Sequence, residues 1–129
     1  MEEQKRVLVI DDEESVRDAY VDALEDVPCV VETASSGEEG LRKAQTGSVA
    51  LIFLDLKMPG MSGADVLRKI RSFDEKVVVY IVTAFHGEFL DKLEAIERDG
   101  LTFKLLHKPI GQEAIRKVTA AALGQSASG

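Results

Sequence analysis

Acidic, hydroxyl and amine side chains follow apolar runs at four places in this chain. The run "VLVIDD" ends in Asp11 and Asp12, "IFLD" ends in Asp55, "YIVTA" holds Thr83, and "LLHKP" holds Lys108. Carboxylates that share one crevice repel each other, by about 4 kcal/mol for two unit charges 4 Å apart at an effective dielectric of 20. A hard divalent cation relieves this repulsion, and oxygen-rich, partly hydrated sites suit Mg²⁺. If these residues meet, the pattern indicates a Mg²⁺ site beside an amine.

That combination suits the transfer of a phosphoryl group to a carboxylate. The metal ion and Lys108 neutralise charge on the phosphoryl oxygens, and Thr83 offers a hydrogen-bond donor. An aspartate can itself act as the nucleophile. Asp11 and Asp12 form a pair, which favours metal binding, whereas Asp55 stands alone at the end of its run. We interpret Asp55 as the residue that takes the phosphoryl group.

Short apolar runs alternate with amphipathic stretches, and this alternation predicts the elements that position these residues. Two capping-box patterns, Ser36 to Glu39 and Ser62 to Asp65, mark helix starts. Five β-α units predict an α/β fold, a parallel sheet with helices on both faces, whose strands end at a ligand-binding rim. The predicted strands are 6–10, 29–34, 50–54, 77–82 and 103–106, and the predicted helices are 14–26, 36–47, one from 62, one from 89 to a stop at 100, and 112–123.

Composition narrows the class of protein. The chain has 129 residues, enough for one domain, and its 23 acidic and 16 basic residues give a formal net charge of −7. Arg68, Lys69 and Arg71 are interspersed with apolar residues on a predicted helix, so no basic cluster indicates nucleic-acid binding. No apolar run approaches the ~20 residues of a membrane span. Cys29 is the only cysteine, which we interpret as a packed, unreactive thiol. A soluble cytoplasmic protein is expected.

Four motifs in this order and spacing resemble the receiver domain of two-component response regulators. They are "VLVIDDE", "LIFLDLKMPGMSG", "VTA" and "KP", and the similarity runs from Lys5 to Leu123. The resemblance implies a flavodoxin-like (βα)₅ fold, a doubly wound five-stranded parallel sheet in the order 2-1-3-4-5. We expect residues 1–123 to form the receiver domain. The tail 124–129, "GQSASG", is expected to be a flexible end, the start of a linker or a leftover of cloning.

The resemblance also implies roles for individual residues. Asp55 would accept a phosphoryl group from a histidine of a sensor kinase or phosphotransfer protein. Asp12 and Asp55 would bind Mg²⁺ directly, the backbone carbonyl of Lys57 would be a third ligand, and Asp11 would act mainly through water. Lys108 would contact the phosphoryl group. Two further implications are that Thr83 and its neighbour Ala84 take part in the switch, and that the peptide bond before Pro109 is cis.

The chain departs from the family pattern near this switch. The family has an aromatic residue three positions before the lysine, where this chain has Leu105, and Phe103 stands two residues earlier on the same strand face. The resemblance implies that Lys57 and Phe85 occupy positions that tune how fast the phosphoryl group is lost to water. The stretch from Thr83 to Lys108 is a few residues longer than usual.

Three function classes remain open at this point. The first is a signalling module controlled by phosphorylation, which is not an enzyme acting on other substrates. Such a module binds a downstream protein or an output domain, and homodimers are common in the family. The second is a Mg²⁺-dependent aspartyl-phosphate phosphatase of the haloacid-dehalogenase type, which has a second acid where this chain has Lys57. The third is a receiver-like scaffold that no longer uses phosphorylation. His86 and His107 lack metal-ligand spacing and are expected to be structural or exposed.

Overall fold

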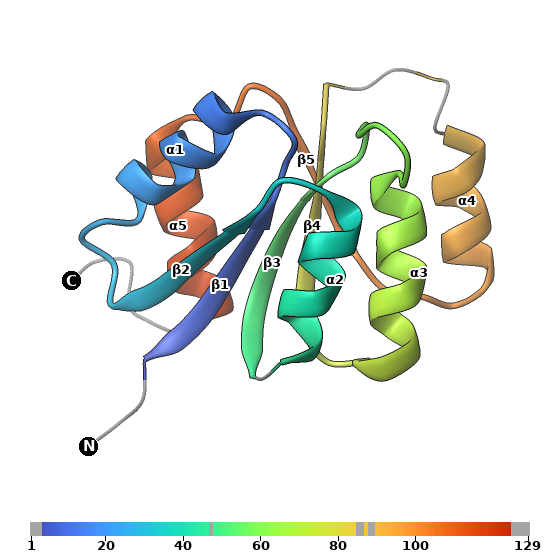
Figure 1. Cartoon of the computed structure of the whole chain (residues 1–129), viewed down its shortest axis with the longest axis horizontal. Helices are drawn as coiled ribbons and strands as arrows, with labels where there is room; N and C mark the ends of the chain where they lie inside the picture. Colours follow the sequence, from blue (N-terminus) through green and yellow to red (C-terminus); the bar gives the residue numbers. More distant parts are fainter. Residues whose placement is uncertain (1–3, 47, 85–86, 88–89, 125–129) are drawn as a thin grey trace.

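The computed structural model describes residues 4–46, 48–84, 87 and 90–124. In these residues, parallel strands and helices alternate along the chain (Figure 1). The sheet order is β2-β1-β3-β4-β5, so the predicted flavodoxin-like fold is confirmed. The strands are β1 (Lys5–Ile10), β2 (Cys29–Ala34), β3 (Val49–Asp55), β4 (Val78–Thr83) and β5 (Lys104–His107), and the helices are α1 (Glu14–Ala23), α2 (Gly37–Gln45), α3 (Gly63–Phe73), α4 (Leu90–Arg98) and α5 (Gln112–Ala122).

Helices cover both faces of the sheet (Figure 1), with α1 and α5 on one face and α2, α3 and α4 on the other. Two apolar cores result. Phe53 of β3 packs with Tyr20 and Ile115 under α1 and α5, whereas Leu54 packs with Leu67 on the opposite face. Because both faces are buried, the central strands are continuous apolar runs rather than alternating ones.

Local contacts account for two differences between predicted and observed element ends. The first helix ends at Ala23 instead of 26, since the chain then tightens into i→i−3 turns before Pro28, which disfavours helix at the residue before it. β4 begins at Val78 instead of 77, because the Val77 N–H donates to the Asp74 carboxylate (3.0 Å) and the Val77 carbonyl accepts from Arg71 (2.7 Å).

The turn from β3 into α3 holds the end of the central strand. Ser62 and Asp65 form the predicted capping box, each side chain accepting from the other residue's N–H at 3.2 Å. The second predicted box is only half formed: Ser36 accepts from Glu39 N–H, but the Glu39 carboxylate accepts from Ser35 instead. A Cβ atom on Gly63 would lie 2.4 Å from the Asp55 carbonyl oxygen. Glycine at this position therefore lets α3 start directly against the strand that ends in Asp55.

Two expectations from composition can be compared with the fold. Across the described ranges, no helix has both the length and the apolar character that a membrane crossing needs. Burial raises the pKa of the half-buried Cys29 thiol, in agreement with the interpretation of a packed, unreactive side chain. Residues 125–129 of the expected tail lie outside the described part of the chain.

Candidate functional site

Strand register brings two of the predicted acids together. Ile10 of β1 is paired with Leu54 of β3, so the next residue on each strand, Asp11 and Asp55, lies at the same level of the sheet. Both carboxylates are buried, Asp11 at 3% and Asp55 at 5% relative exposure. An unpaired carboxylate is costly to bury, so the arrangement requires compensating positive charge.

Register also places the hydroxyl and the amine at this rim. Asp55 is paired with Val82 of β4, and Thr83, one residue further on, is paired with His107 of β5. Lys108 follows His107, and its N–H donates to the Thr83 carbonyl at 2.8 Å. The peptide bond between Lys108 and Pro109 is cis, as the resemblance implies. The ends of β1, β3, β4 and β5 thus meet around one site.

Lys108 supplies the positive charge. Its Nζ lies 3.0 Å from Asp55 Oδ1 and 3.6 Å from Asp11 Oδ2. Asp12 completes the acidic cluster from an exposed position, and Asp11, Asp12 and Asp55 each offer a carboxylate oxygen within 4.8 Å of the others. Three carboxylates face one amine, so the cluster keeps an excess of negative charge.

The pKa values of these groups reflect the same imbalance. Burial and, after it, the Asp11 charge raise the pKa of Asp55, the hydrogen bond from Lys108 opposes both, and the resulting pKa is about 6. Burial also raises the pKa of Asp11, against the lowering effect of a hydrogen bond from the Glu13 N–H. Burial alone would lower the pKa of Lys108, but its hydrogen bond to Asp55 and the two acidic charges outweigh burial and raise it.

This donor set fits Mg²⁺. The side-chain ligand atoms of Asp11, Asp12 and Asp55 are carboxylate oxygens, and the exposed Asp12 leaves the cluster open to water on one side. Mg²⁺ in proteins takes one or two carboxylates, keeps several waters and leaves room for phosphate oxygens. A divalent cation here would also balance the buried negative charge that a single lysine leaves uncompensated.

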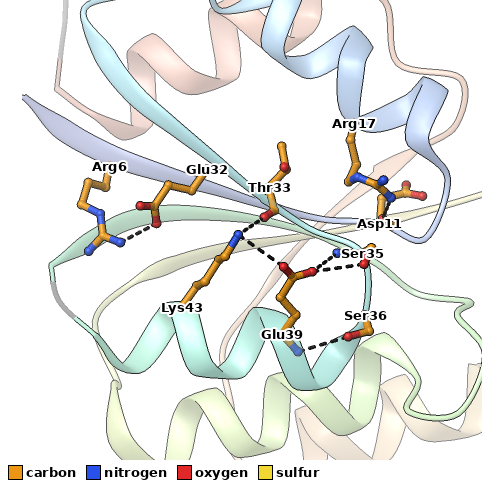
Figure 2. Close-up of polar contacts among 9 residues, drawn as sticks. All are labelled: Arg6, Asp11, Arg17, Glu32, Thr33, Ser35, Ser36, Glu39 and Lys43. Carbon is orange, nitrogen blue, oxygen red and sulfur yellow. Dashed lines mark hydrogen bonds and ion pairs between the residues drawn. The ribbon is translucent and has the colours of Figure 1, made fainter.

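The turn after β1 is held by backbone and side-chain contacts. The Asp11 N–H donates to the Ala34 carbonyl (3.1 Å), and the Glu13 N–H donates to Asp11 Oδ1 (2.9 Å). Arg17 reaches back from α1, and its Nη1 donates to the Asp11 carbonyl at 2.8 Å (Figure 2). Sequence reasoning did not single out Arg17. The available signal was that Arg17 is the only basic residue between 13 and 26, a segment rich in acids.

A second polar network joins α2 to β2 on the neighbouring side (Figure 2). Lys43 donates to the Thr33 carbonyl and lies 3.5 Å from the Glu39 carboxylate, which in turn accepts from Ser35. These contacts hold the end of β2, whose Ala34 carbonyl accepts from Asp11.

The remaining predicted site residues differ in how exposed they are and in which core they contact. Lys57 and Ala84 are exposed, and His107 is exposed as well, which is one of the two alternatives expected for it. Phe103 packs against the core under α2, α3 and α4, whereas Leu106 packs on the other face. Alternation therefore assigns Leu105 to the Phe103 face, where it is 39% exposed. Phe85 and His86 lie outside the described residues.

A doubly wound parallel sheet with an acidic cluster and a lysine at its carboxyl rim places this chain among the α/β domains whose sites lie beyond the carboxyl ends of the strands. Within that class, the family model for the response regulator receiver domain matches residues 7–120. The chain belongs to this family of two-component signalling domains, and the resemblance of its motifs is confirmed.

Relatives and solved structures agree with this assignment. The alkaline phosphatase synthesis transcriptional regulatory protein PhoP of Bacillus subtilis is 39% identical over 93 residues, which cover 72% of this chain and 38% of that protein. A CheY-like receiver domain from Methanospirillum hungatei superimposes with a TM-score of 0.81 at 25% identity, covering 98% of this chain and 100% of that one. TrrA of Thermotoga maritima, solved in complex with Mg²⁺ and BeF, gives a TM-score of 0.77 at 27% identity, covering 92% and 99%.

The chain matches only part of the curated relatives. It spans 36% to 49% of the length of eight of these relatives. Their names include several transcriptional regulators and one protein-glutamate methylesterase. The output of a receiver in this family therefore differs from protein to protein.

Proposed function

We propose that this chain is a phosphorylation-activated receiver that accepts a phosphoryl group on Asp55. The observation that carries the proposal is the buried Asp55 at the end of β3, with Lys108 Nζ at 3.0 Å and two further acids beside it. The donor is a phosphorylated histidine of a sensor kinase or phosphotransfer protein. A carboxylate oxygen of Asp55 attacks phosphorus, the phosphorus–nitrogen bond breaks, and the histidine nitrogen takes a proton from water.

Each residue of the site has a role in this step. Asp12, Asp55 and the Lys57 carbonyl would hold Mg²⁺, with Asp11 acting through water, and the bound ion would neutralise charge on the phosphoryl oxygens. Lys108 already lies against Asp55 and would pair with a phosphoryl oxygen. Thr83, buried at the end of β4, would turn its hydroxyl toward the same group.

These contacts are sufficient in number to drive a switch. Moving a two-state equilibrium from 1:99 to 99:1 takes about 5.5 kcal/mol. A hydrogen bond to a charged group contributes roughly 1.5–3 kcal/mol. Two or three new bonds to the phosphoryl group, from Thr83, Lys108 and a backbone amide near Ala84, therefore reach the required energy, and a single bond does not. Leu105 on β5 and Phe103 just before it would then respond, and Lys57 and Phe85 would set the lifetime of the phosphoryl group.

The proposal includes the setting in which the switch operates. The domain works in the cytoplasm, and its altered surface binds a downstream protein or an output domain, in some states as a homodimer. Support for a partner beside the site comes from an apolar cavity of about 330 Å³ next to Lys108, lined by α1 and by residues that follow β5. The net charge of −7 is a reason to assign no nucleic-acid contact to this domain itself.

The test is intact mass after incubation with acetyl phosphate and Mg²⁺. We expect a gain of one phosphoryl group that is lost with a chelator and absent from Asp55→Asn. Asp22→Asn, which neutralises an exposed acid on α1, is the matched control and should gain the group normally. Consumption of acetyl phosphate without a mass gain would favour the phosphatase alternative. Neither consumption nor gain would favour the phosphorylation-independent scaffold and contradict the proposal.

A further inference from the structure

Arg17 contacts the acidic site without taking part in it directly. It lies on the first turns of α1, where its own N–H donates to the Glu13 carbonyl as part of the helix. Its half-buried side chain turns back toward β1, and Nη1 donates to the Asp11 carbonyl at 2.8 Å (Figure 2). The guanidinium thus bonds the main chain of the acidic turn and not a carboxylate.

This contact restrains the peptide group that joins Asp11 to Asp12. The carbonyl of Asp11 and the N–H of Asp12 lie in one plane, because the peptide bond does not rotate freely. Holding the oxygen therefore fixes the plane and, with it, the direction in which Asp12 leaves the chain. Asp11 has two further restraints, the bonds from its N–H to Ala34 and from Glu13 to its carboxylate.

Asp12 lacks comparable restraints. It is exposed, and within the residues that the structure describes no hydrogen bond or ion pair holds its carboxylate. A ligand that is held only through its backbone depends on whatever fixes that backbone. In the described contacts of the Asp11–Asp12 peptide group, Arg17 is the side chain that does so.

We propose that Arg17 is a positioning residue that presents Asp12 to a divalent cation through the Asp11–Asp12 peptide group. The inference rests on the proposed function, because it assumes that Mg²⁺ binds at the acidic cluster. It assigns Arg17 no contact with the cation or with the phosphoryl group.

Charge and positioning predict opposite effects of removing Arg17. If Arg17 acted only as a positive charge near the acids, its removal would tighten the binding of a cation. If it only fastened α1 to β1, its removal would lower stability and leave cation affinity unchanged. The positioning role instead predicts weaker binding, as is typical of residues that orient metal ligands from a second layer.

The test compares Mg²⁺ dissociation constants of Arg17→Met, Arg17→Lys and wild type by isothermal titration calorimetry. Arg6→Met is the matched control, because Arg6 is also half-buried and pairs with Glu32 near the opposite end of the sheet (Figure 2). We expect Mg²⁺ to bind about tenfold more weakly to Arg17→Met. Arg17→Lys, which retains a donor, should recover most of the affinity, and Arg6→Met should bind like wild type.

A spectroscopic readout accompanies the affinity. In ¹H–¹⁵N spectra without metal, the Asp12 amide signal should shift in Arg17→Met far more than in Arg6→Met, because its peptide plane is released. If Arg17→Met does not fold, Arg17→Gln provides the comparison at lower temperature. Unchanged or tighter Mg²⁺ binding in folded Arg17→Met or Arg17→Gln overturns the inference alone, whereas no Mg²⁺ binding by wild type overturns the proposed metal site as well.

Discussion

Burial of the Asp55 carboxylate lowers the stability of the metal-free fold, and this effect can be measured by changing the pH or by mutation. Its pKa rises from 3.8 to about 6 on folding, first because of burial and then because of Asp11. An acid with a raised pKa in the folded state binds its proton more tightly there. The metal-free protein should therefore lose stability as pH rises from about 4 to about 6, and it should not regain it above that range.

Asp55→Asn removes this cost while Lys108 keeps Asp11 as a partner. We expect the variant to be more stable than wild type by about 1–3 kcal/mol near pH 7.5 in a chelator, since one pKa unit corresponds to about 1.4 kcal/mol. Urea denaturation measures the difference, and the loss between pH 4 and 6 should be smaller in the variant. Asp22→Asn, on the exposed side of α1, should change stability by less than about 0.5 kcal/mol. Equal stability of wild type and Asp55→Asn would contradict the expectation.

Gly63 is a second residue on which the site depends. In Gly63→Ala the new Cβ would lie 2.4 Å from the Asp55 carbonyl oxygen and 2.8 Å from Leu56 Cα, both backbone atoms. The end of β3 would have to move, so we expect a loss of about 1–3 kcal/mol in unfolding free energy and weaker Mg²⁺ binding. Gly111→Ala is the control, because no atom lies within 4 Å of its Cβ position and its φ is −76°. A Gly63→Ala variant as stable as Gly111→Ala would show that the turn can relax.

Single-residue prediction from the sequence succeeds or fails for a physical reason. Asp11, Asp55 and Lys108 could be placed at one site because each follows an apolar run, and parallel strands end at the same edge. Arg17 could not, because helical spacing fixes where a long side chain starts but not which main-chain carbonyl it reaches. Contacts of this kind depend on the turn that precedes the helix.

At the scale of whole elements, one arginine joins α3 to the starts of two strands. Arg71 Nε and Nη2 donate to the Thr102 carbonyl (3.0 and 2.8 Å), and Nη1 donates to the carbonyls of Val77 (2.7 Å) and Asp74 (3.2 Å). Thr102 leads into β5 and Val77 into β4. Burial lowers the pKa of Arg71, although its bonds to carbonyls compensate for much of the lost hydration.

Arg71→Met should therefore loosen the strand starts, since it removes the donors to the buried Val77 carbonyl and to the part-buried Thr102 and Asp74 carbonyls. We expect a loss of about 2–4 kcal/mol in unfolding free energy, measured by urea denaturation. Arg68→Met on the same helix is the matched control. Arg68 is exposed and pairs with Asp99 at 2.8 Å, so its loss should change stability by less than about 1 kcal/mol. Similar losses in the two variants would mean that the buried contacts of Arg71 have no special weight.

The two arginines Arg68 and Arg71 show what the sequence can and cannot predict about a whole helix. Composition placed Arg68 and Arg71 together on one amphipathic helix, and that helix exists. The pattern could not tell the exposed residue from the buried one, because the distinction depends on the chain between α4 and β5 folding back beside α3. These contacts also define where strands start. For this reason the sequence placed the start of β4 one residue too early, at 77 and not at Val78.

At the scale of the whole molecule, general and specific electrostatics make separable contributions to stability. With a net charge of −7, the excess acidic side chains repel one another in the compact state, and any salt screens part of that repulsion. Mg²⁺ bound at the acidic cluster adds a specific term that grows as RT ln(1 + [Mg²⁺]/Kd), about 2.7 kcal/mol at one hundred times Kd. Sodium chloride screens the general repulsion but does not add the specific stabilisation by bound Mg²⁺.

Thermal unfolding in matched salts distinguishes the two contributions. At equal ionic strength, for example roughly 10 mM MgCl₂ against about 30 mM NaCl, we expect the midpoint to be several degrees higher in the magnesium salt. Asp12→Asn should abolish this difference but keep the response to NaCl, because it removes an open-side ligand of the cluster. Asp22→Asn removes the same formal charge from α1 and should keep both responses. A magnesium effect that survives Asp12→Asn, or that falls equally in both variants, would mean that the ion acts on the charge of the whole molecule and not at the rim of the sheet.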